Sequence, residues 1–299
     1  MNKKSLAILT PSYNRGYILP QLYESLNKQS VFDFKWYIID DGSSDDTKKV
    51  VSTFQTDKFE ISYIYKENGG KHTALNVGLE HIKEELTFIV DSDDFLTEDA
   101  VETIVNDWGK YKNREENICG LSYYRLKLDG SVIGDSFSNK VLIDTFINVR
   151  VNNKIKGDKA EIYLTSVLKQ FPFPSFPDER FLSEAIVWNA ISNAGYKLVF
   201  LDKGIYYCEY LADGLSVNSR KLQLTNAKGT LLHAKAHFYK SVKTGIRLKY
   251  MLMYISVIKF VNKKYSEAFM DLNSGKILYV LVFLPAWLLA IYWKRKYKL

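Results

Sequence analysis

The first hundred residues alternate short apolar runs with amphipathic segments. Runs rich in β-branched and aromatic residues predict buried strands, and apolar residues recurring every three or four positions predict helices between them. The strands are expected at 5–10, 34–40, 61–67 and 86–90, and the helices at 18–29, 47–55, 72–83 and 97–108. This alternation predicts an α/β fold, a mostly parallel sheet covered by helices on both faces.

Polar residues at two of these helix starts are typical of N-caps. Asp45, Asp46 or Thr47 opens the second helix, and Thr97 precedes the fourth, with Glu98 in its first turn. Such side chains accept hydrogen bonds from the free N–H groups of a first turn.

Beyond residue 117 the pattern becomes irregular. Residues 118–134 predict an antiparallel hairpin that turns at Asp129-Gly130. Further along, we expect a helix near 159–169, a proline-rich loop at 171–177, a helix at 179–195 closed by Gly195, strands at 197–202 and 204–210, and basic helices over 220–270. The chain is therefore divided into an α/β domain over 1–219, with halves at 1–115 and 116–219, and a helical tail over 220–299.

Charge is distributed unevenly between these regions. The net charge is +7, but the residues from Arg220 onward hold 16 Lys/Arg and 2 Asp/Glu, a balance of +14, which leaves −7 for residues 1–219. A basic region of this kind is suited to an anionic surface, either nucleic acid or an anionic membrane leaflet. Nucleic acid is disfavoured as a partner, because the basic residues alternate with long aliphatic runs.

The end of the chain favours the membrane. Residues 277–293 carry no charge and precede the basic run "KRKYK" (294–298). Seventeen residues is the short limit for a spanning helix, Pro285 lies in the middle, and the tyrosines and tryptophans suit an interface. The alternative is a buried helical hairpin of a soluble oligomer.

Cysteine usage indicates a reducing compartment. Cys119 and Cys208, the only two cysteines, each lie in a predicted strand, so a disulfide framework is not expected. The N-terminal apolar run, about five residues long, is shorter than the apolar region of a signal peptide.

Polar side chains collect where the first strands end, in "PSYNR" (11–15), "DDGSSDDT" (40–47), "ENGGKH" (67–72) and "DSDD" (91–94). Ligands of parallel sheets bind at the carboxyl ends of the strands, so these segments are expected to share one crevice.

The fourth segment offers a metal site. Asp91 and Asp93 are two residues apart on a turn, so both carboxylates can point the same way and bind Mg²⁺ or Mn²⁺ together with substrate phosphates. The alternative is that this turn only caps the helix that starts near 97.

The other segments suit a nucleotide. Asp41 can accept a hydrogen bond from a base or a ribose hydroxyl, or else cap the helix at 47, and Tyr13 can stack on a base. Gly70 and Lys71 offer flexible backbone and a cation for a diphosphate at a helix N-terminus.

Taken together, "TPSYNR" (10–15), "IDDGSSDDT" (39–47), "ENGGKHTALNVGL" (67–79) and "VDSDD" (90–94) resemble the motifs of a family 2 glycosyltransferase with the GT-A fold. The resemblance covers residues 5–110 closely and reaches about 215 more loosely. It implies an inverting enzyme with a nucleotide-binding half (1–115) and an acceptor-binding half (116–219), which moves a sugar from a nucleotide diphosphate, usually UDP.

The resemblance also implies roles for individual residues. Asp91 and Asp93 match the metal-binding D-x-D motif, with Asp93 the surer ligand. The donor-binding positions are Pro11, Tyr13, Asp41, Gly70, Lys71, Asp91 and Ser92.

The catalytic base of the family usually comes from an "ED"-type motif, which reads Glu184-Ala185 here, so the usual aspartate is missing. Glu184 is the first candidate for the base, followed by Glu179 and Asp178; a solvated helix residue is the alternative for Glu184. The processive "QxxRW" signature is absent after Trp188, which favours addition of one sugar per acceptor.

The expected acceptor is a polyprenyl-linked or other cell-surface glycan at the cytoplasmic face of a bacterial membrane. Residues 209–220 resemble a loop of some bacterial members that could close over the diphosphate, or they are a connector. Two other functions stay open at this point: a nucleotidyltransferase, for which "PSYNRGY" is a poor match, and an inactive binding protein with the same fold.

Overall fold

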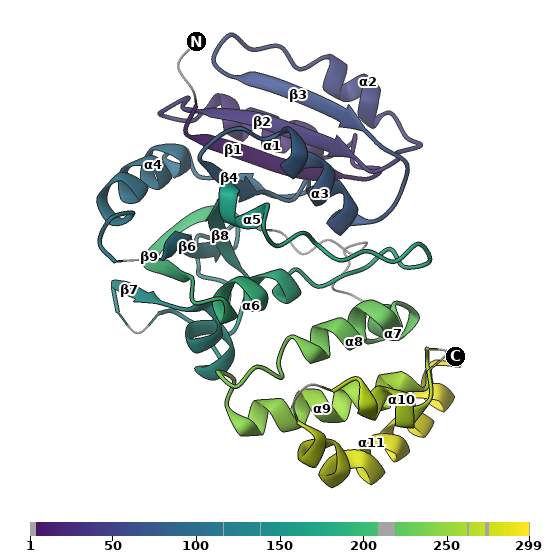
Figure 1. The fold of residues 1–299 in the computed structure, drawn as a ribbon. Helices are drawn as coiled ribbons and strands as arrows, with labels where there is room; N and C mark the ends of the chain where they lie inside the picture. The colour runs from purple at the N-terminus through teal and green to yellow at the C-terminus, as the bar shows by residue number, and fades with distance from the viewer. Residues whose placement is uncertain are drawn as a thin grey trace. The chain divides into compact units, whose positions relative to one another are not determined.

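The structure, a computed structural model, describes residues 4–115, 117–137, 139–208, 219–261, 263–272 and 275–298. They belong to two compact units (Figure 1). Unit 1 holds Met1–Thr145, Ile155–Phe173 and Gly195–Tyr210, and unit 2 holds Phe146–Lys154, Pro174–Ala194 and Leu211–Leu299. Each is described by itself.

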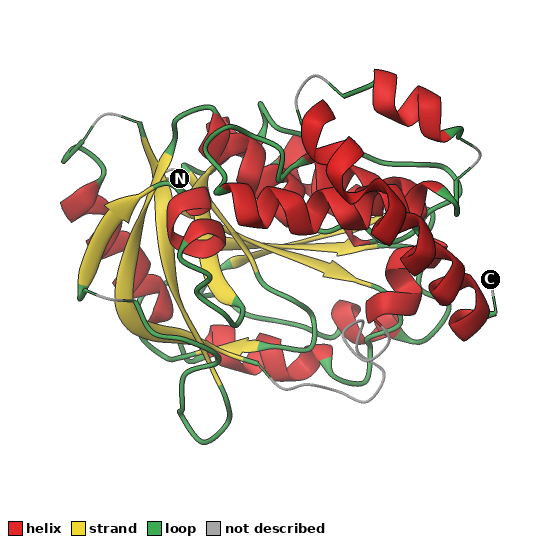
Figure 2. Cartoon of the chain, turned by 90° about the horizontal axis from the view of Figure 1, so that it is seen from below, coloured by secondary structure: helices red, strands yellow, loops and turns green. Residues whose placement is uncertain are grey.

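Unit 1 is built on one mixed sheet, whose twisted strands are yellow in Figure 2. Its strands are β1 (Leu6–Ser12), β2 (Phe34–Asp40), β3 (Glu60–Tyr65), β4 (Leu86–Ile89), β5 (Phe95–Leu96), β6 (Ile118–Leu126), β7 (Val141–Asp144), β8 (Lys159–Leu164) and β9 (Lys197–Tyr207). Their order is β3-β2-β1-β4-β8-β6-β9-β5, and β7 pairs with β9. The first four strands are parallel, β8 runs antiparallel to β4 and β6, and β6 is parallel to β9.

Helices cover both faces of the parallel part, as predicted. The helices of unit 1 are α1 (Leu19–Asn27), α2 (Thr47–Ser52), α3 (Lys71–His81), α4 (Ala100–Tyr111) and α5 (Thr165–Leu168). Side chains alternate across a strand. Leu6 and Ile8 of β1 share a core with α1 and α4. A Cβ on Gly78 of α3 would meet Leu9 and Ile39, so α3 covers the opposite face.

Three predictions beyond residue 117 are wrong in detail. The segment expected to be a helix near 159–169 is mostly strand β8, followed by the four-residue α5. Strands expected at 197–202 and 204–210 form one continuous strand, β9, over its described residues. The turn at Asp129-Gly130 is present, but the returning arm is a single bridge from Leu126 to Val132.

The predicted cap of α4 differs, whereas the N-cap residue of α2 is one of those predicted. Helix α4 begins at Ala100 with Asp99 as its N-cap, and the Thr97 hydroxyl donates to Asp99 instead of capping the helix. Helix α2 follows Asp46, which makes no side-chain cap bond, while Asp45 accepts the N–H of Thr47.

The regular elements named in the described part of unit 2 are all helices. Its elements are the π-helix η1 (Ile147–Asn152), α6 (Ala185–Asn193), α7 (Ser219–Thr225), α8 (Ala227–Lys235), α9 (Thr244–Ile258), α10 (Tyr265–Met270) and α11 (Lys276–Tyr297). The predicted basic helices over 220–270 are thus confirmed. Helix α6 starts later than the predicted 179 and ends just before Gly195, whose φ of 93° suits a helix end.

The core of unit 2 forms where α8, α9, α10 and α11 meet. Met251, Tyr254 and Ile255 of α9 are buried with Ala268 of α10 and Ala286 of α11. By length and composition α11 could cross a membrane, although the core helix of a soluble protein passes the same test.

Candidate functional site

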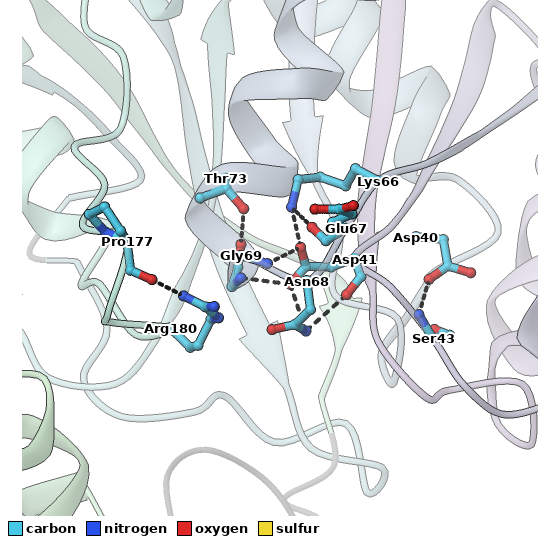
Figure 3. Close-up of polar contacts among 11 residues, drawn as sticks. Asp40, Asp41, Ser43, Lys66, Glu67, Asn68, Gly69, Thr73, Pro177 and Arg180 are labelled. Carbon is cyan, nitrogen blue, oxygen red and sulfur yellow. Dashed lines mark hydrogen bonds and ion pairs between the residues drawn. The ribbon is translucent and has the colours of Figure 1, made fainter.

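Asp41 is the centre of a hydrogen-bond network at the end of β2 (Figure 3). Its side chain is buried. Oδ1 accepts the Lys66 ammonium at 2.5 Å and the Gly69 N–H at 2.9 Å, and Oδ2 accepts the Gly70 N–H at 2.7 Å and the Asn68 amide at 3.3 Å. Asp41 therefore holds the loop that leads from β3 into α3.

Two glycines let this loop approach the end of β2. Gly42 has a φ of 81°, and a Cβ there would lie 2.7 Å from the Asn68 nitrogen. Gly70, the N-cap of α3, has a φ of 93°. Both positions need a residue without a side chain.

The loop after β1 is fastened to the same region. The N–H of Asn14 donates to the Ser43 hydroxyl at 2.9 Å, and the Asn14 side chain accepts the N–H of Ser44 at 2.8 Å. Pro11 is buried within β1, whereas the ring of Tyr13 is exposed. Tyr13 thus keeps an accessible aromatic face next to a rigid loop.

Asp91 is held between two cations of unit 1. It forms an ion pair with Lys71, the first residue of α3, and its Oδ2 lies 3.3 Å from a guanidinium nitrogen of Arg125 on β6. Burial alone would raise the pKa of Asp91, but Lys71 and Arg125 outweigh it and lower that pKa to about 2. Asp91 is therefore ionised across the physiological range.

The other two carboxylates of the turn differ from Asp91. Burial, with the charge of Asp91, raises the pKa of Asp93 despite the nearby cations Arg15 and Lys71. The same two causes raise the pKa of Asp94 to about 7. Asp94 is buried and accepts the Tyr206 hydroxyl at 2.6 Å.

Tyr206 and Arg125 fix the shape of this acidic turn. The Tyr206 hydroxyl also accepts the N–H of Asp91 at 3.0 Å, and the Arg125 guanidinium lies over the Tyr206 ring, 4.2 Å from its centroid. Arg125 reaches Asp94 as well, at 3.4 Å. Strands β6 and β9 thus position the turn that follows β4.

The carboxylate oxygens of this turn are the kind of ligand that a hard divalent cation prefers, in a site shared with a substrate. In the described part of the chain no group of three or more potential ligand side chains forms a closed metal site. The turn does offer two carboxylates, those of Asp91 and Asp93, and burial together with the charge of Asp91 raises the pKa of Asp93. Mg²⁺ and Mn²⁺ are commonly bound by one or two carboxylates together with substrate phosphates, so Asp91 and Asp93 are suited to hold one.

The three candidate bases lie in unit 2 and have different environments. Glu179 is buried, and both its oxygens accept backbone N–H groups of α8, those of Lys228 at 2.7 Å and Gly229 at 2.8 Å. Asp178 forms an ion pair with Lys228 at 2.6 Å. Glu184 is the half-buried N-cap residue of α6. These contacts give Glu179 a structural role, and Glu184 stays the first candidate on the motif that predicted it.

Unit 1 brings most predicted donor-side residues into one connected network. Asp41 binds the N–H of Gly70, and Lys71 binds Asp91, which Ser92 follows as a buried residue. Sequence reasoning missed Lys66, Arg125, Asp94 and Tyr206. Of these only Asp94 carried a signal, as the fourth residue of "DSDD"; the predicted closing loop, 209–220, lies outside the described residues except for its last two positions.

Comparison with known proteins identifies relatives of this arrangement. Residues 7–128 match the model of the family described as Glycosyl transferase family 2. The chain is 29% identical over 211 residues to the glycosyltransferase GlyG of Streptococcus pneumoniae, which covers 67% of this chain and 69% of the relative. It is 28% identical over 188 residues to the GalNAc(5)-diNAcBac-PP-undecaprenol beta-1,3-glucosyltransferase of Campylobacter jejuni, covering 61% and 58%.

The chain spans less than a third of a further relative, GlyA of S. pneumoniae, of which the match covers 30%. Among solved structures, Staphylococcus aureus TarS 1–349 in complex with UDP-GlcNAc has a TM-score of 0.65 at 17% identity, covering 94% of this chain and 81% of that one. A mannosyltransferase from Pyrobaculum calidifontis, in complex with GDP-Man and Mn²⁺, has a TM-score of 0.59 at 14% identity, covering 98% and 87%. These likenesses show the GT-A fold.

Proposed function

Because the chain belongs to glycosyltransferase family 2, we propose that it is an inverting enzyme that transfers one sugar from a UDP-sugar to a lipid-linked or other cell-surface glycan. Support for UDP as the carrier comes from the TarS complex with UDP-GlcNAc. Support for a lipid-linked acceptor comes from the Campylobacter relative, which is named for an undecaprenol diphosphate glycan.

One observation carries this proposal: two consecutive residues, Gly70 and Lys71, connect Asp41 after β2 with Asp91 after β4. Asp41 accepts the N–H of Gly70, and the next residue, Lys71, pairs with Asp91. A site for a nucleotide diphosphate needs polar groups for the nucleoside and cations for the phosphates within one region. Asp41 and the loop before α3 supply the polar groups, and Lys71 at the start of α3 supplies a cation.

Each residue then has a specific task on the donor. Tyr13 stacks on the base, and Asp41 holds the loop around Gly70 in the shape that meets the nucleoside. Lys71 stands at the N-terminus of α3, where backbone N–H groups and the helix dipole also favour a phosphate. Asp91 and Asp93 would hold a divalent cation, which would neutralise negative charge on the diphosphate leaving group.

Inversion requires a base that takes the proton from the acceptor hydroxyl. We assign this role to Glu184, because it matches the family's "ED"-type motif and stands at the N-terminus of α6. Glu184→Gln keeps the shape of the side chain and removes its basicity. It should lose sugar transfer to an acceptor while keeping UDP-sugar affinity.

We propose that the enzyme meets its acceptor at the cytoplasmic face of the bacterial membrane. The basic tail from Arg220 and the apolar α11 give the chain a means of staying near a lipid-linked acceptor. Attraction of a basic region to anionic lipid is expected to hold the enzyme at that surface.

Removal of a predicted metal ligand tests the function. Asp93→Ala should lower Mn²⁺-dependent release of UDP from UDP-sugars by about 100-fold or more, because several kcal/mol of charge stabilisation are lost. Its thermal midpoint should stay within a few degrees of the parent protein, since the side chain adds little packing. Release would be measured over a panel of nucleotide-sugars in the presence of membrane extract.

Asp129→Ala is the matched control, an exposed aspartate on a turn of the same unit. It should keep full activity. Undiminished UDP release by Asp93→Ala would refute the site. Pyrophosphate release from nucleoside triphosphates by the parent protein would instead identify a nucleotidyltransferase, and failure to bind any nucleotide would identify an inactive binding protein.

A further inference from the structure

Helix α11 has two faces of different character. Tyr279, Ala286, Ala290 and Trp293 are buried and recur at helical spacing, so they form one face. The other face carries large apolar side chains that are 38–78% exposed: Ile277, Val280, Leu281, Leu284, Trp287, Leu288 and Tyr292. We call this set the α11 stripe. An exposed apolar surface of this extent marks an interaction site.

The buried face is fastened to the rest of unit 2 near both ends and in the middle. The Tyr279 hydroxyl donates to the Tyr265 carbonyl at 2.9 Å, and the Ser256 hydroxyl of α9 donates to the Ala286 carbonyl at 2.9 Å. Near the other end, the Arg220 guanidinium lies 4.6 Å from the centroid of the Trp293 ring. Helix α11 therefore presents one side outward along its whole length.

A helix that crosses a bilayer needs lipid-compatible surface on every side, or neighbours that cross with it. Its partner α9 has only 15 residues, fewer than the roughly 20 that a crossing needs. Helix α9 also carries Arg247 and Lys249, and Lys259 follows it. A crossing would either break the contacts of α11 or draw these charges into lipid, which is costly.

Charges flank the stripe without interrupting it. Lys276 starts the helix, and Lys294, Arg295 and Lys296 form its last turn. The residues from Arg220 onward carry a net charge of +14. Trp287 and Tyr292 are of the types that favour the boundary between headgroups and acyl chains. Apolar surface with flanking cations is complementary to an anionic bilayer surface.

We propose that α11 lies parallel to the plane of an anionic bilayer, with the α11 stripe embedded at the headgroup boundary and α9 on its protein side. This inference deepens the proposed function and rests on it for the membrane as the enzyme's working surface. It replaces a spanning anchor by a one-sided one, so the whole described chain stays on one side of the membrane.

Vesicle flotation of the full chain tests the binding. The parent protein should float with vesicles of phosphatidylcholine and phosphatidylglycerol (7:3), and much less with pure phosphatidylcholine. The double variant L281E/L284E should lose at least 90% of the floated fraction. The control S241E/T244E changes the charge by the same amount at exposed polar positions of unit 2 and should float like the parent protein. Equal flotation of both double variants would overturn the proposal.

The depth of α11 in the bilayer distinguishes a helix that lies in the membrane plane from one that crosses the membrane. In a background that lacks the two native cysteines (C119A/C208A), a fluorophore would be attached through Ile277→Cys, Leu284→Cys or Tyr292→Cys, one label per protein, and quenched by lipids brominated at different acyl positions. A helix in the plane gives three similar, shallow depths. A deep label at position 284 between two shallow ones would show crossing and overturn the proposal.

UDP release and light scattering distinguish membrane binding by the α11 stripe from catalysis and from dimer formation. UDP release without vesicles should be the same for L281E/L284E and the parent protein, so loss of flotation with normal release supports the α11 stripe independently of catalysis. Absence of UDP release from both proteins would contradict the proposed function. The flotation result would still show whether the α11 stripe binds membranes. Light scattering that shows a parent dimer and a monomeric L281E/L284E, with no flotation by either, would assign the stripe to a second copy of the chain and overturn the proposal.

Discussion

The two units differ in which side chains they bury and which they expose. Unit 1 turns charged groups inward, and Asp41, Asp94 and Arg125 are all largely removed from solvent. Unit 2 turns apolar groups outward, since most of the large exposed apolar side chains of the described residues lie on α11. Inward charge is suited to a small charged ligand, and outward apolar surface is suited to lipid.

The units also treat buried titratable groups differently. In unit 1 the carboxylate of Asp91 keeps its charge because Lys71 and Arg125 pair with it. Among the described residues of unit 2, no carboxylate forms an ion pair with the half-buried His233 or the buried His237, and burial lowers their pKa values to about 3 and about 4. Unit 1 therefore keeps an ionised carboxylate at its candidate site, whereas unit 2 keeps its histidines neutral within a packed helical core.

Arg125→Met is the strongest test of this contrast. It leaves the buried Asp94 without its cation and Asp91 with Lys71 alone, so the free energy of unfolding should fall by about 3–5 kcal/mol, measured by urea denaturation. UDP release should fall as well, because the acidic turn loses its support. Arg125→Lys keeps the charge and should recover part of both losses. Parental stability in Arg125→Met would show that the pairing contributes nothing.

The histidines give a pH test of unit 2. Their folded pKa values lie below the ordinary value of about 6.5, so they are neutral in the fold. The stability they contribute is complete above pH 6.5 and is lost as the pH falls towards 4 for His237 and 3 for His233. The free energy of unfolding should drop by up to about 1.4 kcal/mol per pH unit for each histidine.

His237→Phe isolates one of these two contributions. The His237 ring stacks on Tyr250 with centroids 3.4 Å apart, a contact that a phenyl ring can replace. Between pH 6.5 and 4.5 the variant should show a shallower fall in the free energy of unfolding than the parent protein. An identical pH profile would show that His237 is not buried in its neutral form.

The smallest expected effect compares exposed helix positions in the two units. Gly109 of α4 and Gly245 of α9 are both exposed, and a Cβ at either meets nothing within 4 Å. Gly109→Ala and Gly245→Ala should each raise the free energy of unfolding by about 0.5–1 kcal/mol, because alanine loses less backbone freedom in a helix. Hydrogen exchange within each helix would locate the gain, and a loss of stability would reveal a contact that the fold does not show.

The parallel half of the fold could be predicted from the sequence because its strands are buried on both sides. β1, β2 and β4 are continuous apolar runs, and their observed bounds lie within two residues of the predicted ones. β8 lies where a helix was expected near 159–169. Lys159 is in fact buried, and its ammonium donates to the carbonyls of Ile133 at 2.9 Å and Lys156 at 3.2 Å. The Ile133 carbonyl lies 26 residues away along the chain, so no local pattern shows this contact.

The candidate site was predictable only as far as adjacent residues define it. Asp91, Asp93 and Lys71 follow from their motifs. Arg125 lies 34 residues after Asp91 in an alternating strand, where the sequence gives no sign that it points at a carboxylate. The contacts of Asp41 with the Gly69 and Gly70 N–H groups were equally hidden, because they depend on the parallel pairing of β2 and β3.

The ion pair between Lys71 and Asp91 has one more consequence. Because the chain supplies its own counter-charge to the acidic turn, unit 1 can assemble before any divalent cation arrives. If activity depends on the proposed cation, the cation-free chain would be folded but inactive, and adding the ion would restore activity without refolding.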